Sequence, residues 1–124
     1  MQYILLIYGN EAKLGEATAS LSPEDQQARM GEWFAYTKAL QDAGHYIAGD
    51  ALEPTAKASS VQVRDSGRVV TDGPFAETTE QLGGYYLVDV PDHATALEWA
   101  AKCPGAKNGT MEVRPIMQIP DAPG

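Results

Sequence analysis

The sequence predicts an α+β fold of the ferredoxin-like type, a split βαβ sandwich with an extra β-hairpin. Three observations predict it. The length of 124 residues suits one hydrophobic core. The order strand, helix, strand occurs twice along the chain, and a hairpin pattern separates the two units. We expect one domain over residues 1–118 and a flexible C-terminal tail over residues 119–124.

The first unit opens with residues 3–8 (YILLIY), a continuous apolar run that predicts a central strand covered on both faces. After a connection without a predicted element, Ser22 as cap and Pro23 as first residue predict a helix to about Ala43, closed by Gly44. Residues at spacings of three and four predict its core stripe. This stripe comprises Met30, Trp33, Phe34, Thr37 and Leu40.

A second strand is predicted for residues 45–53 (HYIAGDALE). Residues 60–73 then alternate between apolar and polar on both sides of the sequence Asp-Ser-Gly at 65–67. This is the pattern of a hairpin with a short loop. Another strand is predicted for residues 84–90 (GYYLVDV).

The second helix is predicted to begin after the cap Asp92 and to end before Pro104. Its expected core side holds Leu97, Ala100 and Ala101. The final strand spans residues 110–117, and Pro115 predicts that its far end lies at a sheet edge or bulge. Both helices are expected on one face of the sheet. Because the strands carry apolar residues on both sides, a second copy should cover the other face, which predicts a homodimer.

Charge and composition exclude several classes of protein. The net charge of -8 argues against a nucleic-acid partner, because phosphate binding needs clustered Lys and Arg. The N-terminus lacks a signal-peptide pattern and the chain lacks a long apolar run, so we expect no membrane segment and a cytoplasmic location. Cys103, the single cysteine, can form no internal disulfide. The histidines, His45 and His93, lack ligand-like spacing, so neither a metal site nor a cofactor is expected.

Residues 71–86 (TDGPFAETTEQLGGYY) allow two interpretations. In the structural one, Asp-Gly-Pro at 72–74 is a turn, and Thr78 with Gln81 forms a capping box for a single helical turn. In the functional one, a structured loop over a cleft places Asp72 as a catalytic base or a ligand anchor. The residues leave both open.

Aromatic side chains are numerous enough to line a pocket, which we expect between the first helix and the sheet, closed by the loop after residue 71. Arg114 would bind a carboxylate or phenolate there, and Asp72 a hydroxyl or amine. The predicted pocket residues are Trp33, Asp50, Phe75, Tyr85 and Arg114.

Segments along nearly the whole chain resemble the YCII-related family, specifically its DGPF-domain branch. They are LLIYG, AGDAL, VTDGPFAETTEQLGGYYLVDV, ALEWAAKCP and EVRPIM. The resemblance implies a ferredoxin-like dimer known as a dimeric α/β barrel. It also implies a His/Asp dyad, and at least one relative with that dyad is a dehydrochlorinase acting on a chlorinated aromatic ring. DGPF-type proteins are similar to proteins encoded beside or fused to alternative sigma factors.

The dyad itself is missing. By spacing, its His position falls on Trp33 and its Asp position on Cys103, before Pro104. Trp cannot transfer a proton, and a lone cysteine is a poor substitute for a carboxylate. Three hypotheses follow. The protein binds a small organic molecule, with any catalysis being proton transfer or elimination through Asp72. Alternatively, it is a regulatory or protein-interaction module with a transcription-related partner, or an enzyme that has lost its activity and kept its fold.

Overall fold

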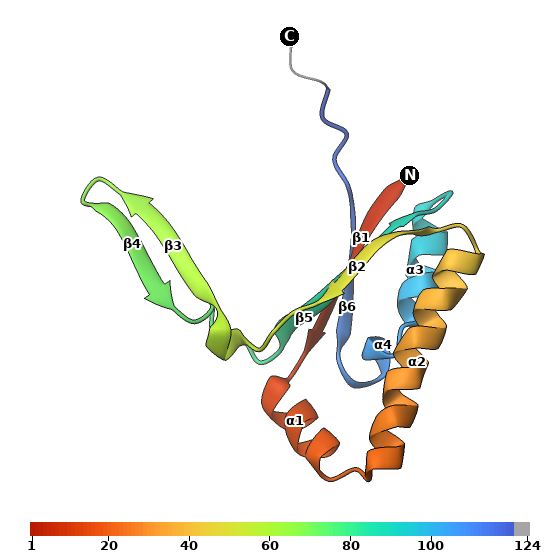
Figure 1. Cartoon of the computed structure of the whole chain (residues 1–124). Coiled ribbons are helices and arrows are strands. Elements are labelled where there is room, and N and C mark those ends of the chain that lie inside the picture. Colours follow the sequence, from red (N-terminus) through yellow and green to blue (C-terminus); the bar gives the residue numbers. More distant parts are fainter. Residues whose placement is uncertain (121–124) are drawn as a thin grey trace.

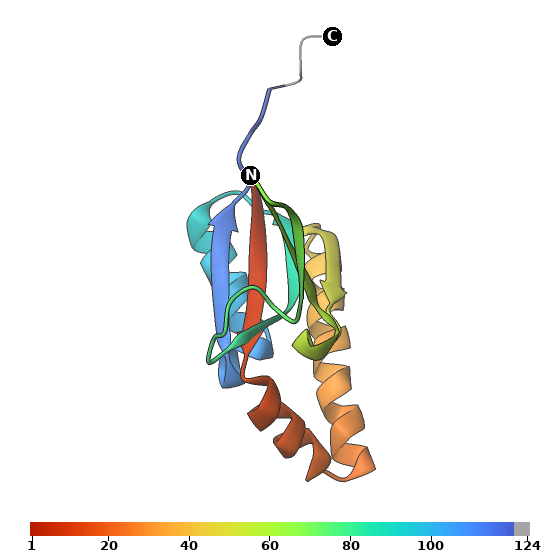
Figure 2. The same cartoon turned by 90° about the vertical axis from the view of Figure 1, so that its left-hand side faces the viewer.

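The computed structural model describes residues 1–120, in which a four-stranded antiparallel sheet has the strand order β2-β5-β1-β6. Helices α2 and α3 both lie on one face of this sheet (Figures 1 and 2). Without the hairpin, the chain runs β1-α2-β2 and then β5-α3-β6, so the predicted ferredoxin-like α+β fold is confirmed. The elements are β1 Gln2–Gly9, α2 Pro23–Asp42, β2 Tyr46–Ala51, β5 Gln81–Asp89, α3 His93–Lys102 and β6 Thr110–Pro115.

Strand β1 is central, as its apolar sequence predicts. Leu5 pairs with Tyr86 of β5 on one side and with Val113 of β6 on the other. Strand β6 is an edge strand, and its last residue is Pro115, which cannot donate a ladder hydrogen bond. Within residues 1–120, no helix combines the length and apolar character needed to span a bilayer. The tail predicted for residues 119–124 lies outside the described residues from 121 onward.

The core lies between the sheet, the second half of α2 and α3. Successive strand residues face opposite sides, so Tyr86 and Val88 point toward the helices while Tyr85 and Leu87 point away. Tyr36 on α2 meets Tyr86 edge to face, with ring centroids 5.3 Å apart. The buried residues are Tyr3, Leu5, Tyr36, Leu40, Tyr86, Val88, Val90, Ala96, Ala100 and Cys103.

Helix α2 begins and ends as predicted, but two of the five residues of its predicted core stripe are exposed. The Ser22 hydroxyl accepts a hydrogen bond from the Asp25 amide at 3.1 Å, and Gly44 has the positive φ of 75° that ends the helix. Leu40 is fully buried, whereas Met30 and Phe34 are 57% and 69% exposed. The N-terminal part of the helix therefore lies beyond the packed core.

The core side of α3 also differs from the prediction. Ala96 and Ala100 are buried, whereas Leu97 is 49% exposed and Ala101 is exposed. Ala100 was predicted correctly, whereas Ala96 and not Leu97 or Ala101 shares the buried face with it. Small residues at 96 and 100 let α3 pack closely, and the larger Leu97 remains at the surface.

Helix α1, Glu11–Ala19, was not predicted and fills the connection after β1. Its cap is Asn10, whose side-chain oxygen accepts a hydrogen bond from the Lys13 amide at 2.9 Å. No residue of α1 is buried, so the helix lacks the apolar stripe on which such predictions depend. Two further short helices are η1, Thr55–Lys57, and α4, Gly105–Asn108.

The predicted hairpin is present as a two-stranded sheet of its own, β3 Ser59–Arg64 and β4 Gly67–Asp72. Arg64 pairs with Gly67, so the loop is Asp65 and Ser66, and Gly67 has a positive φ of 115°. Figure 1 shows the hairpin projecting away from the four-stranded sheet.

The helical turn predicted around Thr78 is wrong, because residues 74–80 contain bends and no helix. The capping-box residues have other partners. The Gln81 side-chain nitrogen donates to the Thr78 carbonyl at 2.6 Å, and the Gln81 side-chain oxygen accepts from the backbone amide of Glu11 at 2.9 Å. The turn at Gly73 is present, with a positive φ of 96°. Gln81 therefore attaches α1 to β5 instead of capping a helix.

Candidate functional site

A cavity of about 640 Å³ opens between α1, the first half of α2, α4 and strands β1, β2 and β5. At two positions of its floor, a glycine allows neighbouring side chains to lie close to the backbone. A Cβ atom on Gly49 would lie 2.8 Å from the Tyr86 ring, and one on Gly105 would lie 2.8 Å from Ile7 and 3.2 Å from Trp33. Larger residues at these two positions would press on side chains that line the cavity.

The wall of this cavity is rich in aromatic and aliphatic side chains, as is typical of sites for small organic molecules. Its apolar members come from α2, α1 and three strands of the sheet. They are Ile7, Leu14, Met30, Trp33, Phe34, Tyr46 and Tyr86. The exposure of Met30 and Phe34, which contradicts their predicted role in the core, follows from this position on the cavity wall.

Two hydroxyl groups form the polar part of the inner wall. The Thr37 and Tyr86 hydroxyl oxygens lie 2.7 Å apart, and the Thr37 hydroxyl is also 3.0 Å from the Trp33 carbonyl. Burial raises the pKa of Tyr86. Tyr86 therefore keeps its proton at neutral pH and cannot act as a base. Because the Thr37 hydroxyl donates to the Trp33 carbonyl, the Tyr86 hydroxyl donates to Thr37, and its oxygen remains able to accept a hydrogen bond from a ligand.

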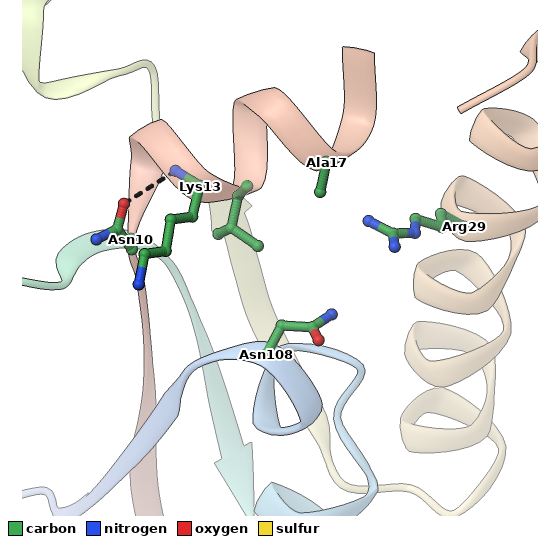
Figure 3. A pocket seen from close by; sticks show the side chains of 6 residues that line it. Asn10, Lys13, Ala17, Arg29 and Asn108 are labelled. Carbon is green, nitrogen blue, oxygen red and sulfur yellow. Dashed lines mark hydrogen bonds between the residues drawn. The ribbon is translucent and has the colours of Figure 1, made fainter. Parts of the chain in front are cut away.

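A smaller cavity of about 230 Å³ lies at the end of the larger one, beneath α1. Figure 3 shows Arg29 projecting from α2, and Asn108 from α4, toward this space. The two cavities share Leu14, Arg29 and Asn108. The smaller one is lined by Asn10, Lys13, Leu14, Ala17, Arg29 and Asn108.

Three predicted pocket residues, Trp33, Asp50 and Tyr85, border the larger cavity. Trp33 comes from α2 and packs against the core. Tyr85 is next to Tyr86, so its side chain points to the opposite face of the sheet, where its hydroxyl donates to an Asp50 carboxylate oxygen at 2.6 Å. That hydrogen bond raises the pKa of Tyr85. Asp50 and Tyr85 thus border the cavity from strands β2 and β5, but their carboxylate and hydroxyl groups bind each other on the opposite face of the sheet.

The structure does not bring the other three predicted residues to this cavity. Asp72 ends β4 and is exposed, and Phe75 is 78% exposed in the following loop. Arg114 alternates with the half-buried Val113, which packs on the core, so its side chain lies on the far face of β6. Because the hairpin carries residues 72–75 away from the body, α1 borders the cavity in place of the expected loop.

Sequence reasoning missed Lys13, Arg29 and the pairing of Thr37 with Tyr86. The signal available for Lys13 was Asn10, a good capping residue placed just before a polar helix. Thr37 was assigned to the core stripe, although a hydroxyl in that position needs a hydrogen-bond partner. No motif or spacing in the sequence marks Arg29 as a binding residue.

The two residues at the dyad positions lie in different environments. Trp33 borders the cavity, whereas Cys103 is 1% exposed in the core. Burial raises the pKa of Cys103 to about 11, so the thiol is neutral at physiological pH and cannot replace a carboxylate. Among residues 1–120, no group of three or more His, Cys, Asp or Glu side chains could hold a metal ion.

The fold defines a ferredoxin-like α+β protein, and its cavity is lined largely by aromatic and aliphatic side chains. The sequence model of the YCII-related domain matches residues 1–120, and the chain belongs to the YCII-related family. An uncharacterized protein of Rhizobium meliloti (strain 1021) is 34% identical over 118 residues, which cover 94% of this chain and 92% of that protein.

Proposed function

We propose that the protein binds a small organic molecule with an apolar body in the larger cavity. The volume of about 640 Å³ carries the proposal, because ligand sites commonly measure about 300 to 1,000 Å³. Trp33, Tyr46 and Tyr86 offer ring faces to an apolar ligand, and the Thr37–Tyr86 hydroxyl pair offers one polar contact.

Binding can be tested by two-dimensional NMR, because the chain has two tryptophans and only Trp33 borders the cavity. We expect the neutral probe 2-naphthalenemethanol to shift the Trp33 indole N–H signal and to leave that of Trp99 unchanged. The variant Trp99→Phe assigns the two signals. If a millimolar excess of the probe shifts neither signal, or shifts both equally, the cavity does not bind apolar ligands and the proposal fails.

The proposal includes cofactor-independent proton transfer or elimination as the class of reaction, with Asp72 as the base. Because Asp72 lies outside the cavity of its own chain, this role requires β4 of a second copy to reach the site. Asp72→Asn should then abolish turnover of a bound substrate while the affinity for 2-naphthalenemethanol stays unchanged. An unchanged rate would remove Asp72 from the mechanism.

We also propose a homodimer, the dimeric α/β barrel that the sequence predicts, formed by the sheet face opposite the helices. Ile4, Leu6 and Leu87 lie on this face and are only half-buried in the single chain. A second copy would remove their apolar surface from water. Native mass spectrometry should give about twice 13.3 kDa, and Leu6→Glu should convert the dimer to a monomer. A monomeric parent protein would refute the proposed interface.

A second candidate function is protein interaction through the hairpin, including the regulatory partner linked to transcription. It is favoured by Val61 and Val63, which are 60% and 74% exposed on one face of β3. We expect Val63→Arg to release any host protein that the parent chain retains, while probe binding in the cavity stays unchanged. Retention of the same partner by the variant would exclude this surface.

A further inference from the structure

We propose that the bound molecule is an anion, with a carboxylate held by Arg29 beside Asn108 in the smaller cavity and an apolar body against Trp33. The inference rests on the proposed binding function and adds the chemical class of the ligand. It concerns neither the dyad positions nor the hairpin.

The lining of the smaller cavity carries the first part of the argument. Lys13 and Arg29 supply positive charge, and Asn10 and Asn108 supply amide groups that can donate hydrogen bonds. No acidic residue is among the side chains that line it. The Asn10 oxygen is occupied by the Lys13 amide, which leaves its nitrogen as the available group. This set of donors matches an anionic oxygen group.

The second part is the direction of Arg29, which, like Lys13, forms no ion pair in the part of the chain that the structure describes. Of the nine Lys and Arg side chains, only Lys38 and Lys57 form an ion pair within residues 1–120, so the direction of Arg29 and not its unpaired state carries this part of the argument. Lys38, on the same helix as Arg29, pairs with Asp42 at 2.6 Å. Arg29 has Asp25 and Glu32 at the helical spacings that favour ion pairs, yet it contacts neither within 4.0 Å. Its guanidinium group instead projects toward the space beneath α1 (Figure 3).

Carboxylates near the larger cavity are directed away from the proposed anion. The Glu11 carboxylate accepts hydrogen bonds from the Thr55 amide at 3.0 Å and the Thr55 hydroxyl at 2.6 Å. Asp50 accepts from Tyr85. Glu32 also lines the larger cavity, beside Trp33. Because Glu32 is about one helical turn from Arg29, its charge acts on the same end of the cavity, and the orientation of the ligand rests on the direction of the Arg29 guanidinium group beneath α1.

The shared wall of the two cavities sets the shape of the ligand. Leu14, Arg29 and Asn108 line both spaces, so one molecule can contact the aromatic wall and the cationic end together. The planar guanidinium of Arg29 can bind a carboxylate through two parallel hydrogen bonds. An amphipathic acid with a ring or a short chain fits these requirements.

The test compares 2-naphthoate with 2-naphthalenemethanol, which has the same ring system without the charge. Affinities are measured from the Trp33 indole signal in the whole protein. We expect naphthoate to bind at least about tenfold more tightly, the equivalent of about 1.4 kcal/mol. Arg29→Gln should reduce naphthoate affinity about tenfold and leave the affinity for the alcohol unchanged. Lys13→Gln, on the opposite side of the same cavity, should reduce naphthoate affinity less than Arg29→Gln does.

Lys38→Gln is the matched control, because it removes a positive charge from the same helix at a position that borders neither cavity. It should leave both affinities unchanged. If the two probes bind equally and Arg29→Gln affects neither, the anion site is refuted while the binding function stands. If neither probe moves the Trp33 signal, both proposals fail. Equal losses in Lys38→Gln and Arg29→Gln would indicate a general charge effect and refute the site.

Discussion

The two halves of α2 show how one helix can serve both stability and binding. In the second half, Tyr36 and Leu40 are buried against the sheet and α3. In the N-terminal part, which extends to Phe34, Met30 and Phe34 are exposed and line a cavity. The apolar residues are present in both halves, but only the second half has a closely packed partner. Apolar surface that finds no partner within the chain can bind a ligand.

The largest expected effect in this comparison comes from Leu40→Ala. Leu40 is fully buried, and removing three carbon atoms leaves a void that the core cannot fill completely. The free energy of unfolding should fall by about 2 to 5 kcal/mol, as measured by urea denaturation.

Met30→Ala is the matched control on the same helix. Because Met30 is 57% exposed, its truncation should change the free energy of unfolding by less than about 0.5 kcal/mol. A similar loss in both variants would mean that the first half of α2 is packed as tightly as the second, which would contradict the division of the helix.

A smaller effect is expected where α1 covers the open half. With no buried residue of its own, α1 is attached by polar contacts, chiefly the two hydrogen bonds from Thr55 to the Glu11 carboxylate. Glu11→Ala should destabilise this attachment by about 1 kcal/mol and speed hydrogen exchange of the α1 amides by roughly fivefold to tenfold. The amides of Leu5 and Val88 in the core should exchange as before.

Glu16→Ala tests whether the faster exchange of α1 results from the loss of the hydrogen bonds between Thr55 and Glu11. It removes the same charge from the same helix, and the Glu16 side chain makes no hydrogen bond or ion pair within residues 1–120. Exchange of the α1 amides should stay near the parent rate. Equal acceleration in both variants would mean that the attachment does not depend on Thr55.

The bounds of α2 and the strands were predictable from the sequence because their signals are local. Ser22, Pro23 and Gly44 mark the ends of α2 through their own backbone chemistry, and the alternation of the strands is visible residue by residue. The hairpin was predictable for the same reason, since Gly67 supplies the positive φ that its turn requires.

The open half was harder to predict because it depends on contacts between distant segments. The buried face of a helix follows from its periodicity, but the partner on that face does not, so Met30 and Phe34 were assigned to a core. Arg29 and Asn108 are far apart in the sequence and line the same cavity only in the folded chain. The direction in which the hairpin leaves the sheet decides the position of Asp72, and no local pattern encodes that direction.

The smallest effect is expected at the N-terminus of α3, where the exposed residue Asp92 caps the helix. Its carboxylate oxygen accepts hydrogen bonds from the Thr95 amide at 2.8 Å and the Thr95 hydroxyl at 2.7 Å, which lower the pKa of Asp92. A lowered pKa means that ionised Asp92 stabilises the fold above pH of about 3.9, the value in an unfolded chain. That stabilisation is lost as the pH falls through the lowered pKa.

Asp92→Asn isolates this contribution, because asparagine also caps helices but does not ionise. Between pH 6 and pH 3, the melting temperature of the parent protein should fall further than that of the variant, since all other carboxylates are common to both. Parallel melting profiles would show that Asp92 has the same pKa in the folded and unfolded chains. A steeper fall in the variant would reverse the sign and contradict the hydrogen bonds from Thr95. Because Asp92 lies at the surface, this difference should be far smaller than the loss expected for Leu40→Ala.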